Sequence, residues 1–330
     1  MTIYSDFIGD NRRIDVLTNR GEAHRVPPVW RPLLGDFDAL VAVPDMHMFF
    51  YGSFQDCFHY GARAMRDFLR HLVEVQQSYR QAGRRLMVAQ LGDMYELRFP
   101  HPETGRPATR RAIAASHPLY TEILDLLKQL KTLYVVGNHD YELAQSPGTV
   151  VAATIGKVYM EHGYQADRWY HFTNPDCRLW QSSMVLYAVF RRWEARFNRF
   201  RRMARTLREG QYAAFGVLSG ERERNFPGDV LAYPHQRLRY YDGRVREEWR
   251  RGNPVRICLT AHSHIPLLYT HACNDHCWFV DAGAWTEGRS DFAVITSEEI
   301  AVCRYRREAV RVSVPVTAPL LRPEAAMAGR

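Results

Sequence analysis

The chain has 330 residues, of which 46% are hydrophobic and 24% charged, as in an ordinary globular protein that can bury a core. Six cysteines scattered over this length exclude a small disulfide scaffold and are typical of a reducing compartment. The formal net charge of +8 favours acidic partners, namely phosphorylated substrates, nucleic acid or an anionic membrane surface, without choosing among them.

Targeting and membrane segments are not visible in the sequence. The first six residues lack the basic region and apolar stretch of a signal peptide. No apolar run approaches the roughly 18 residues that a membrane span requires. We therefore expect a soluble, cytoplasmic protein.

The first 38 residues are polar and contain several prolines, and the run from Gly35 to Asp38 is interpreted as a turn because it precedes a strand. The first buried strand is predicted at 40–43, and Asp45 and His47 follow its end. Residues two apart in extended backbone point to the same side, so these two side chains can share one metal ion. The pair alone also fits a solvated aspartate beside an incidental histidine.

A helix predicted at 56–81 leads to a second buried strand at 86–91. Gly92 lets the backbone turn sharply after this strand, which leaves Asp93 at the edge of the sheet. A carboxylate has two oxygens, so Asp93 alone can join two metal sites. A helix predicted at 119–130 then leads into the next strand.

The central strand, predicted at 133–136, ends in a glycine followed by Asn138, His139 and Asp140. Open α/β sheets bind their ligands at the carboxyl ends of parallel strands. Asn138 offers a carbonyl oxygen to a metal, and His139 offers an imidazole for proton transfer. Asp140 can accept the other ring N–H and fix the tautomer of His139.

Two later strands also end in histidines. The strand at 157–161 precedes His162, although a single histidine there is more often a hydrogen-bonded core residue than a ligand. The strand at 256–261 precedes His262 and His264, which share an orientation. The segments 278–285, 292–295 and 300–303 are predicted as closing strands of a second sheet packed against the first.

The composition changes between residues 167 and 254, where tryptophan, tyrosine and arginine become frequent. Apolar side chains from Leu186 to Leu207 recur at helical spacing, and arginines from Arg191 to Arg208 crowd the same stretch, which predicts a long amphipathic helix. Two interpretations stay open. The helix either packs on the core with a solvated basic face, or forms a lid whose arginines hold phosphate or acidic lipid head groups.

These elements divide the chain into four parts. Residues 1–166 form the first half of a core, 167–254 a largely helical insertion rich in arginine and aromatic residues, 255–313 the second half of the core, and 314–330 a loose C-terminal tail. Cys273, His276 and Cys277 lie close together in the sequence like zinc ligands, but their spacing does not fit the usual paired pattern. Their role is left open.

Five blocks of polar residues, each after a plausible strand, follow one another along the chain. They are Asp45-x-His47, Gly92-Asp93-x-x-Glu96, Gly137-Asn138-His139-Asp140, His162-Gly163 and His262-x-His264. In order and spacing this set resembles the calcineurin-like metallophosphoesterase superfamily. The resemblance implies an α/β fold, namely a layered β-sandwich flanked by helices, here with a helical insertion. It also implies a site for two divalent metal ions.

The resemblance further implies a role for each block. One ion would take Asp45, His47, Asp93 and His264, and the other Asp93, Asn138, His162 and His262. Mixed carboxylate, amide and imidazole ligands suit manganese, with iron or zinc as alternatives. A hydroxide held by the metals would attack a phosphodiester or pyrophosphate bond. His139, oriented by Asp140, would act as the general acid.

Glu96 and the His162-Gly163 block are most similar to the branch that contains UDP-diacylglucosamine pyrophosphatase, although that branch has arginine where this chain has His139. We therefore expect a phosphorylated small-molecule or nucleotide-lipid substrate, with peripheral contact to an anionic membrane. A nuclease that holds nucleic acid on the basic insertion is the less favoured alternative. A protein-serine/threonine phosphatase and a scaffold without metals are the others.

Overall fold

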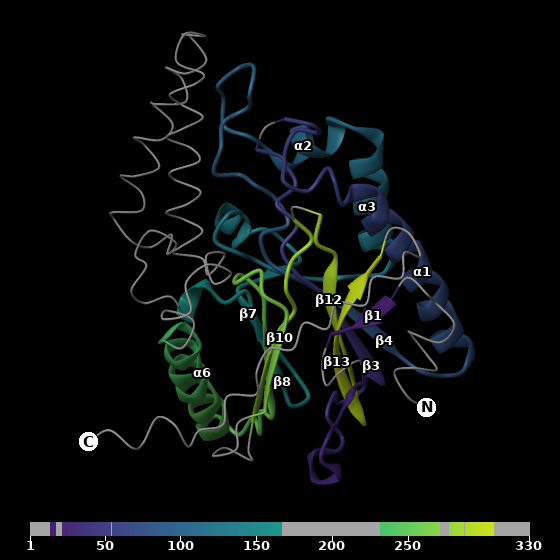
Figure 1. Ribbon diagram of the computed structural model, residues 1–330, viewed down its shortest axis with the longest axis vertical. Helices are drawn as coiled ribbons and strands as arrows, with labels where there is room; N and C mark the ends of the chain where they lie inside the picture. Colours follow the sequence, from purple (N-terminus) through teal and green to yellow (C-terminus); the bar gives the residue numbers. More distant parts are fainter. Residues whose placement is uncertain are drawn as a thin grey trace.

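Two β-sheets packed face to face, with helices outside them, form the protein in the computed structural model (Figure 1). The structure describes residues 14–17, 22–53, 55–166, 232–270, 277–286 and 288–306. Helices α1 (Ala62–Gln81) and α3 (Pro118–Gln129) lie on the side of the first sheet, and α6 (Ala232–Arg250) lies on the side of the second. The predicted layered α/β architecture is confirmed.

The first sheet has a parallel centre. Its strand order is β1 (Ile14–Val16), β13 (Glu299–Tyr305), β12 (Asp291–Thr296), β3 (Ala39–Val43), β4 (Leu86–Leu91), β5 (Leu133–Val135) and β6 (Thr149–Val150), and β2 (His24–Arg25) pairs with β13. The run from β3 to β6 is parallel. Every residue of β3 is buried because Val41 faces the helical layer whereas Leu40 faces the second sheet.

The prediction for two of the closing strands is wrong. Strands β12 and β13 belong to the first sheet, where β12 pairs antiparallel with β3 and places Val294 opposite Val41. The physical reason is that β12 is buried on both of its faces. Phe292 packs among the helices on one side, and Ile295 packs between the sheets on the other.

The second sheet supplies the opposite wall of the sandwich. Its order is β10 (Leu267–Thr270), β11 (Trp278–Asp281), β9 (Ile257–Thr260), β8 (Val158–Glu161) and β7 (Ala152–Ile155). Its three central strands, β11, β9 and β8, are parallel. Met160 and Leu259 of this sheet pack against Leu40, Ala89 and Leu91 of the first sheet in one buried apolar cluster.

Helix α1 covers the outer face of the first sheet through a stripe of apolar side chains that includes Phe68 and Leu72. It begins six residues later than predicted because residues 56–61 form turns, although Phe58 in these turns is still buried. The other short helices among the residues that the structure describes are α2 (Arg110–Ala115) and the 3₁₀ turns η3 (Pro28–Trp30), η4 (Tyr141–Leu143) and η5 (Tyr164–Ala166).

Only the end of the predicted insertion can be compared with the structure. Residues 232–250 are helical, as α6. The predicted amphipathic helix at 186–208, the tail at 314–330, and Cys273 and His276 lie outside the described residues. The four-part division of the chain therefore stays a prediction. No helix in the described part of the chain is long and apolar enough to cross a membrane.

Candidate metal centre

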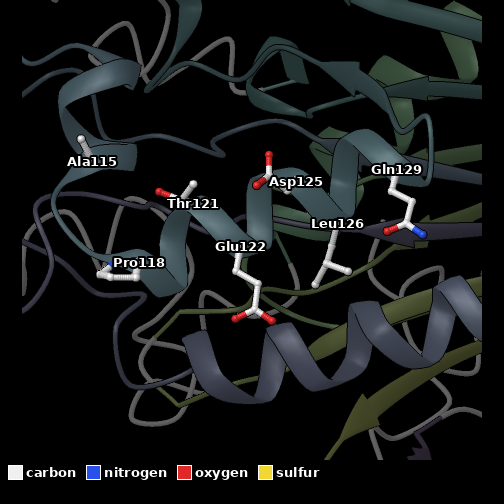
Figure 2. Close-up of a pocket in the computed structure, with 7 residues that line it drawn as sticks. All are labelled: Ala115, Pro118, Thr121, Glu122, Asp125, Leu126 and Gln129. Carbon is white, nitrogen blue, oxygen red and sulfur yellow. The ribbon is translucent and has the colours of Figure 1, made fainter.

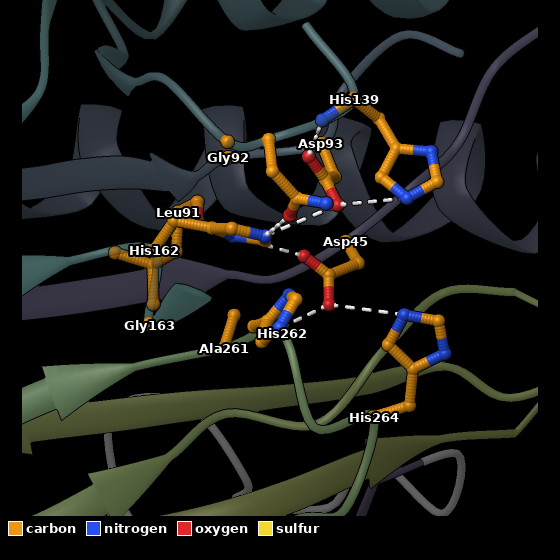
Figure 3. Close-up of polar contacts among 12 residues, drawn as sticks. Asp45, Leu91, Gly92, Asp93, His139, His162, Gly163, Ala261, His262 and His264 are labelled. Carbon is orange, nitrogen blue, oxygen red and sulfur yellow. Dashed lines mark hydrogen bonds and ion pairs between the residues drawn. The ribbon is translucent and has the colours of Figure 1, made fainter. Parts of the chain in front are cut away.

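The predicted ligands lie in turns at the carboxyl ends of parallel strands in both sheets. Asp45, Asp93 and Asn138 follow β3, β4 and β5, whereas His162 and His262 follow β8 and β9. Since the two sheets are stacked, these ends meet at one edge of the sandwich. The side chains of Asp45, Asp93, His162 and His262 point toward one another (Figure 3), and Asn138 lies beside His162. The structure thus brings together all seven residues predicted as metal ligands.

One group of donors consists of Asp45, His47 and His264, whose nearest donor atoms all lie within 4.8 Å of one another. The Nε2 atom of His264 is 3.2 Å from Oδ2 of Asp45 and 3.3 Å from Nε2 of His47. Two imidazole nitrogens that face each other repel unless a proton or a cation lies between them. This pair therefore suits a shared cation.

A second group consists of Asp93, His162 and His262. Nε2 of His162 lies 3.1 Å from Oδ2 of Asp93 and 3.2 Å from Oδ1 of Asn138. The other ring nitrogen of His162 donates to the backbone carbonyl of Leu91 at 2.7 Å. When the ring is neutral, that hydrogen bond selects the tautomer whose Nε2 lone pair faces the group, as is usual for metal-binding histidines.

Asp93 connects the two groups through a single oxygen. Its Oδ1 accepts the backbone N–H of His139 at 2.7 Å, whereas its Oδ2 lies 3.6 Å from Nε2 of His47 and also faces His162. A side chain at Gly137 would put its Cβ 2.0 Å from Oδ1 of Asp93, so the close approach of this turn requires glycine. Oδ2 of Asp93 is thus the carboxylate oxygen that faces histidines of both groups.

The backbone at the centre is strained. Among the described residues, five non-glycine residues have positive φ, and four of them belong to the candidate site: His47, Asp93, His262 and His264. Such conformations cost about 1–3 kcal/mol each and persist where the surroundings enforce them, often at functional sites. The turns are therefore held in shape by contacts outside themselves.

The buried charges of the centre interact strongly with one another. Burial alone would raise the pKa of Asp93, but the neighbouring His162 and His139 hold it well below its usual value. Burial opposes protonation of His162, yet Asp93 and Asp45 raise its pKa to about 10. Oδ1 of Asp45 is buried and lies 3.3 Å from Nδ1 of His162, but it accepts no hydrogen bond from the described residues. Carboxylate, amide and imidazole donors around such an atom fit a pair of divalent ions, and they do not identify the metal.

The predicted contact between Asp140 and His139 is wrong. The carboxylate of Asp140 accepts the backbone N–H groups of Gly137 at 2.8 Å and Tyr95 at 3.2 Å and also the hydroxyl of Tyr134. These hydrogen bonds direct the Asp140 carboxylate away from the imidazole of His139, and they connect the turn at Gly137 to Tyr95 and Tyr134. Burial and the charge of Asp93 raise the pKa of Asp140 to about 6.

Glu96 takes the place predicted for Asp140. Its Oε2 lies 2.5 Å from Nδ1 of His139 and 3.3 Å from Nδ1 of His47, so one carboxylate oxygen orients both rings. Burial favours the neutral acid, but His139 and His47 outweigh it and lower the pKa of Glu96 to about 2. The sequence motif contained Glu96, but the spacing did not reveal which imidazole it would contact.

Arg98 is a residue that sequence reasoning missed. Its Nη1 donates to Nε2 of His139 at 2.7 Å. Arg98 lies only two residues beyond Glu96 in the sequence. Burial lowers the pKa of His139 to about 4, and the charge of Arg98 adds to this effect, although the carboxylate of Glu96 opposes it. His139 also lies close to His47 and Asp93, as a metal ligand would. Because Glu96 and Arg98 occupy both of its ring nitrogens, the geometry favours a different role.

The centre opens on one side. The side chains of His139 and His264 are 21% and 17% exposed, whereas those of Asp45 and His162 are fully buried. A reacting molecule would therefore approach past His139 and His264. A separate pocket runs along α2 and α3 and is lined by Ala115, Pro118, Thr121, Glu122, Asp125, Leu126 and Gln129 (Figure 2). None of these residues belongs to the metal centre.

Comparison with known proteins gives weak likenesses. No family model and no curated protein matches the chain. A conserved uncharacterized protein of Streptococcus pneumoniae TIGR4, described as a predicted phosphoesterase, matches with 14% identity and a TM-score of 0.31, over 80% of this chain and 88% of that one. A dimetal phosphatase from Danio rerio matches with 13% identity and a TM-score of 0.38, over 83% of this chain and 98% of that one. At these TM-scores we draw no conclusion about activity from either match.

Proposed function

We propose that this protein is a dinuclear metal-dependent phosphoesterase that hydrolyses a phosphodiester or pyrophosphate bond. The observation that carries the proposal is the pair of largely buried donor groups, Asp45–His47–His264 and Asp93–His162–His262, with Oδ2 of Asp93 facing both. Two such groups sharing a carboxylate are suited to hold two cations close enough to act on one phosphate. Asn138 adds a neutral oxygen to the second group.

When bound, a pair of divalent ions supplies Lewis acids for the phosphoryl oxygens and lowers the pKa of water. The protein contributes the proton for the departing oxygen through Nε2 of His139. In the described contacts that nitrogen accepts a hydrogen bond from Arg98, while the Nδ1 hydrogen is directed at Glu96. We propose that a phosphoryl oxygen of the substrate takes over the guanidinium of Arg98. This exchange removes the neighbouring positive charge and frees Nε2 of His139 to take up a proton from solvent water, which it then passes to the departing oxygen.

The substrate class rests on charge. The net charge of +8 and the arginines between residues 191 and 208 support a phosphorylated small-molecule or nucleotide-lipid substrate, with peripheral contact to an anionic membrane. Manganese is the proposed metal, and iron or zinc are alternatives with the same donor preferences. The relation to the UDP-diacylglucosamine pyrophosphatase branch stays a prediction from the motifs.

The decisive experiment measures hydrolysis of bis-p-nitrophenyl phosphate by the purified protein with added Mn²⁺. Asp93→Ala and chelation should each abolish activity. Asp125→Ala, which removes an exposed aspartate of α3, should have no effect. Activity that survives both chelation and Asp93→Ala would refute the proposal. A panel of cyclic nucleotides, nucleotide diphosphate sugars, phosphoproteins and nucleic acids then separates a small-molecule esterase from a protein phosphatase or a nuclease.

A further inference from the structure

Helix α6 buries one face against the outer side of the second sheet, and an arginine lies on that face. Arg237, Tyr241 and Val245 are buried at intervals of four residues, so they form one stripe along the helix. Tyr241 and Val245 pack in an apolar cluster with Tyr159 of β8, Cys258 of β9 and Phe279 of β11. At one end of this stripe lies Arg237, on the side where His162 and His262 follow strands β8 and β9.

The guanidinium of Arg237 lies against two of the turns that carry candidate ligands. Its Nη2 donates to the backbone carbonyl of Ala261, the residue before His262, at 3.0 Å. The same Nη2 occupies the space beside Gly163, the residue after His162, where an added Cβ would come within 2.5 Å of it. One side chain of α6 thus contacts the backbone beside both His162 and His262.

A buried carboxylate extends this support to the third histidine. Nη1 of Arg237 donates to Oδ2 of Asp281 at 3.1 Å, and the same oxygen accepts the hydroxyl of Ser263 at 2.6 Å. Ser263 separates His262 from His264, whose φ angles are 73° and 58°. Strained residues of this kind need external contacts to persist. Ala261 and Ser263 are two points at which the Arg237–Asp281 pair supplies such contacts.

We propose that Arg237 is a positioning residue that holds His162 and His262 in place and thereby couples helix α6 to the Asp93–His162–His262 metal position. The inference rests on the proposed function, because it assigns a role at the same metal centre. The Asp45–His47–His264 group meets this network through the turn at Ser263 and through Oδ2 of Asp45, which accepts the backbone N–H of His262 at 2.9 Å. Arg237 contacts none of its three side chains, so this group depends on Arg237 less directly. Helix α6 is the described end of the segment predicted as an insertion, and Arg237 connects this helix to the candidate metal centre.

The test is a titration of the whole metal-free protein with Mn²⁺, with free Mn²⁺ read by electron paramagnetic resonance. Wild type should bind two ions. Arg237→Met should weaken one of the two sites by about 10- to 100-fold, the usual effect of losing a contact behind a metal ligand, and leave the other unchanged. Arg237→Lys should restore part of the loss, because it keeps the charge beside Asp281 without the second donor. Arg246→Met is the matched control, since Arg246 lies on the same helix with 71% of its side chain exposed.

Equal affinities in wild type and Arg237→Met would overturn the inference, and so would equal weakening of both sites, which indicates general destabilisation. If Arg237→Met does not fold, Arg237→Lys decides, because it keeps a cation beside Asp281 and loses one of the two contacts of the guanidinium. Selective weakening of one site then supports the coupling, and unchanged binding refutes it. A wild-type protein that fails to bind a pair of ions refutes the proposed function itself, which this experiment detects separately.

Discussion

Replacing Glu96 by glutamine should slow phosphodiester hydrolysis while both metal positions stay filled at saturating Mn²⁺. Oε2 of Glu96 is 2.5 Å from Nδ1 of His139 and 3.3 Å from Nδ1 of His47. Glutamine has one acceptor oxygen and no charge, so it loses at least the charge assistance of these two hydrogen bonds. Hydrogen bonds to charged groups contribute about 1.5–3 kcal/mol. If that free energy is lost from the transition state, the rate falls roughly 10- to 150-fold.

The assay measures kcat and KM for bis-p-nitrophenyl phosphate over a range of Mn²⁺ concentrations. The loss should appear in kcat, since Glu96 orients the proton donor, and a weaker apparent affinity for Mn²⁺ should report the effect on His47. Glu122→Gln serves as the control, because Glu122 lies on α3 and pairs with Arg70 at the surface. An unchanged kcat in Glu96→Gln at saturating metal would refute the role assigned to this carboxylate.

Three further predictions concern stability. Chelation should lower the thermal midpoint, because ions that bind only the native state stabilise it by about 2.7 kcal/mol at roughly 100 times Kd; an equal midpoint in calorimetry with and without Mn²⁺ would argue against the site. Tyr120→Phe removes a 2.5 Å hydrogen bond to Asp56. Burial raises the pKa of Asp56, so the stability from this carboxyl group is complete below its unfolded pKa and is lost as the pH rises through its folded pKa. The Tyr120 hydroxyl offsets that loss because it donates to the charged form of Asp56. Tyr120→Phe should therefore lower the free energy of unfolding by about 1.5–3 kcal/mol at pH 7 and by less in acid, as measured by urea unfolding. Equal losses at both pH values would contradict this. Phe68→Ala should lower the free energy of unfolding by about 3–5 kcal/mol, since it empties a site between Trp285 and Phe292, whereas Phe68→Leu should lose less.

Local patterns in the sequence were enough to predict where the polar turns lie. The apolar run before Asp45 and the glycines before Asp93 and Asn138 show strands that end in turns. Carboxyl ends of parallel strands share one edge of a sheet, so the expectation that these turns meet needed only the assumption that the strands are parallel. That argument depends on neighbours in the chain, which the sequence displays directly.

Contacts between separate turns were decided by the tertiary structure. His139 has Asp140 beside it in the sequence, yet it contacts Glu96, which is 43 residues away, and Arg98, which is 41 away. The backbone N–H groups of the turn take up Asp140 before it can reach the ring. Likewise, β12 joins the first sheet because one of its faces packs against the helices and the other packs against the second sheet. Both apolar clusters form only when these layers come together.

The sequence by itself therefore determined which side chains stand at the ends of the strands, since alternation and turn chemistry are local properties. The folded chain alone decided the partners that orient those side chains, from Glu96 beside His139 to Arg237 behind His162 and His262. A buried charge pairs with whichever opposite charge the packing brings near, and that choice depends on distances between elements far apart in the chain.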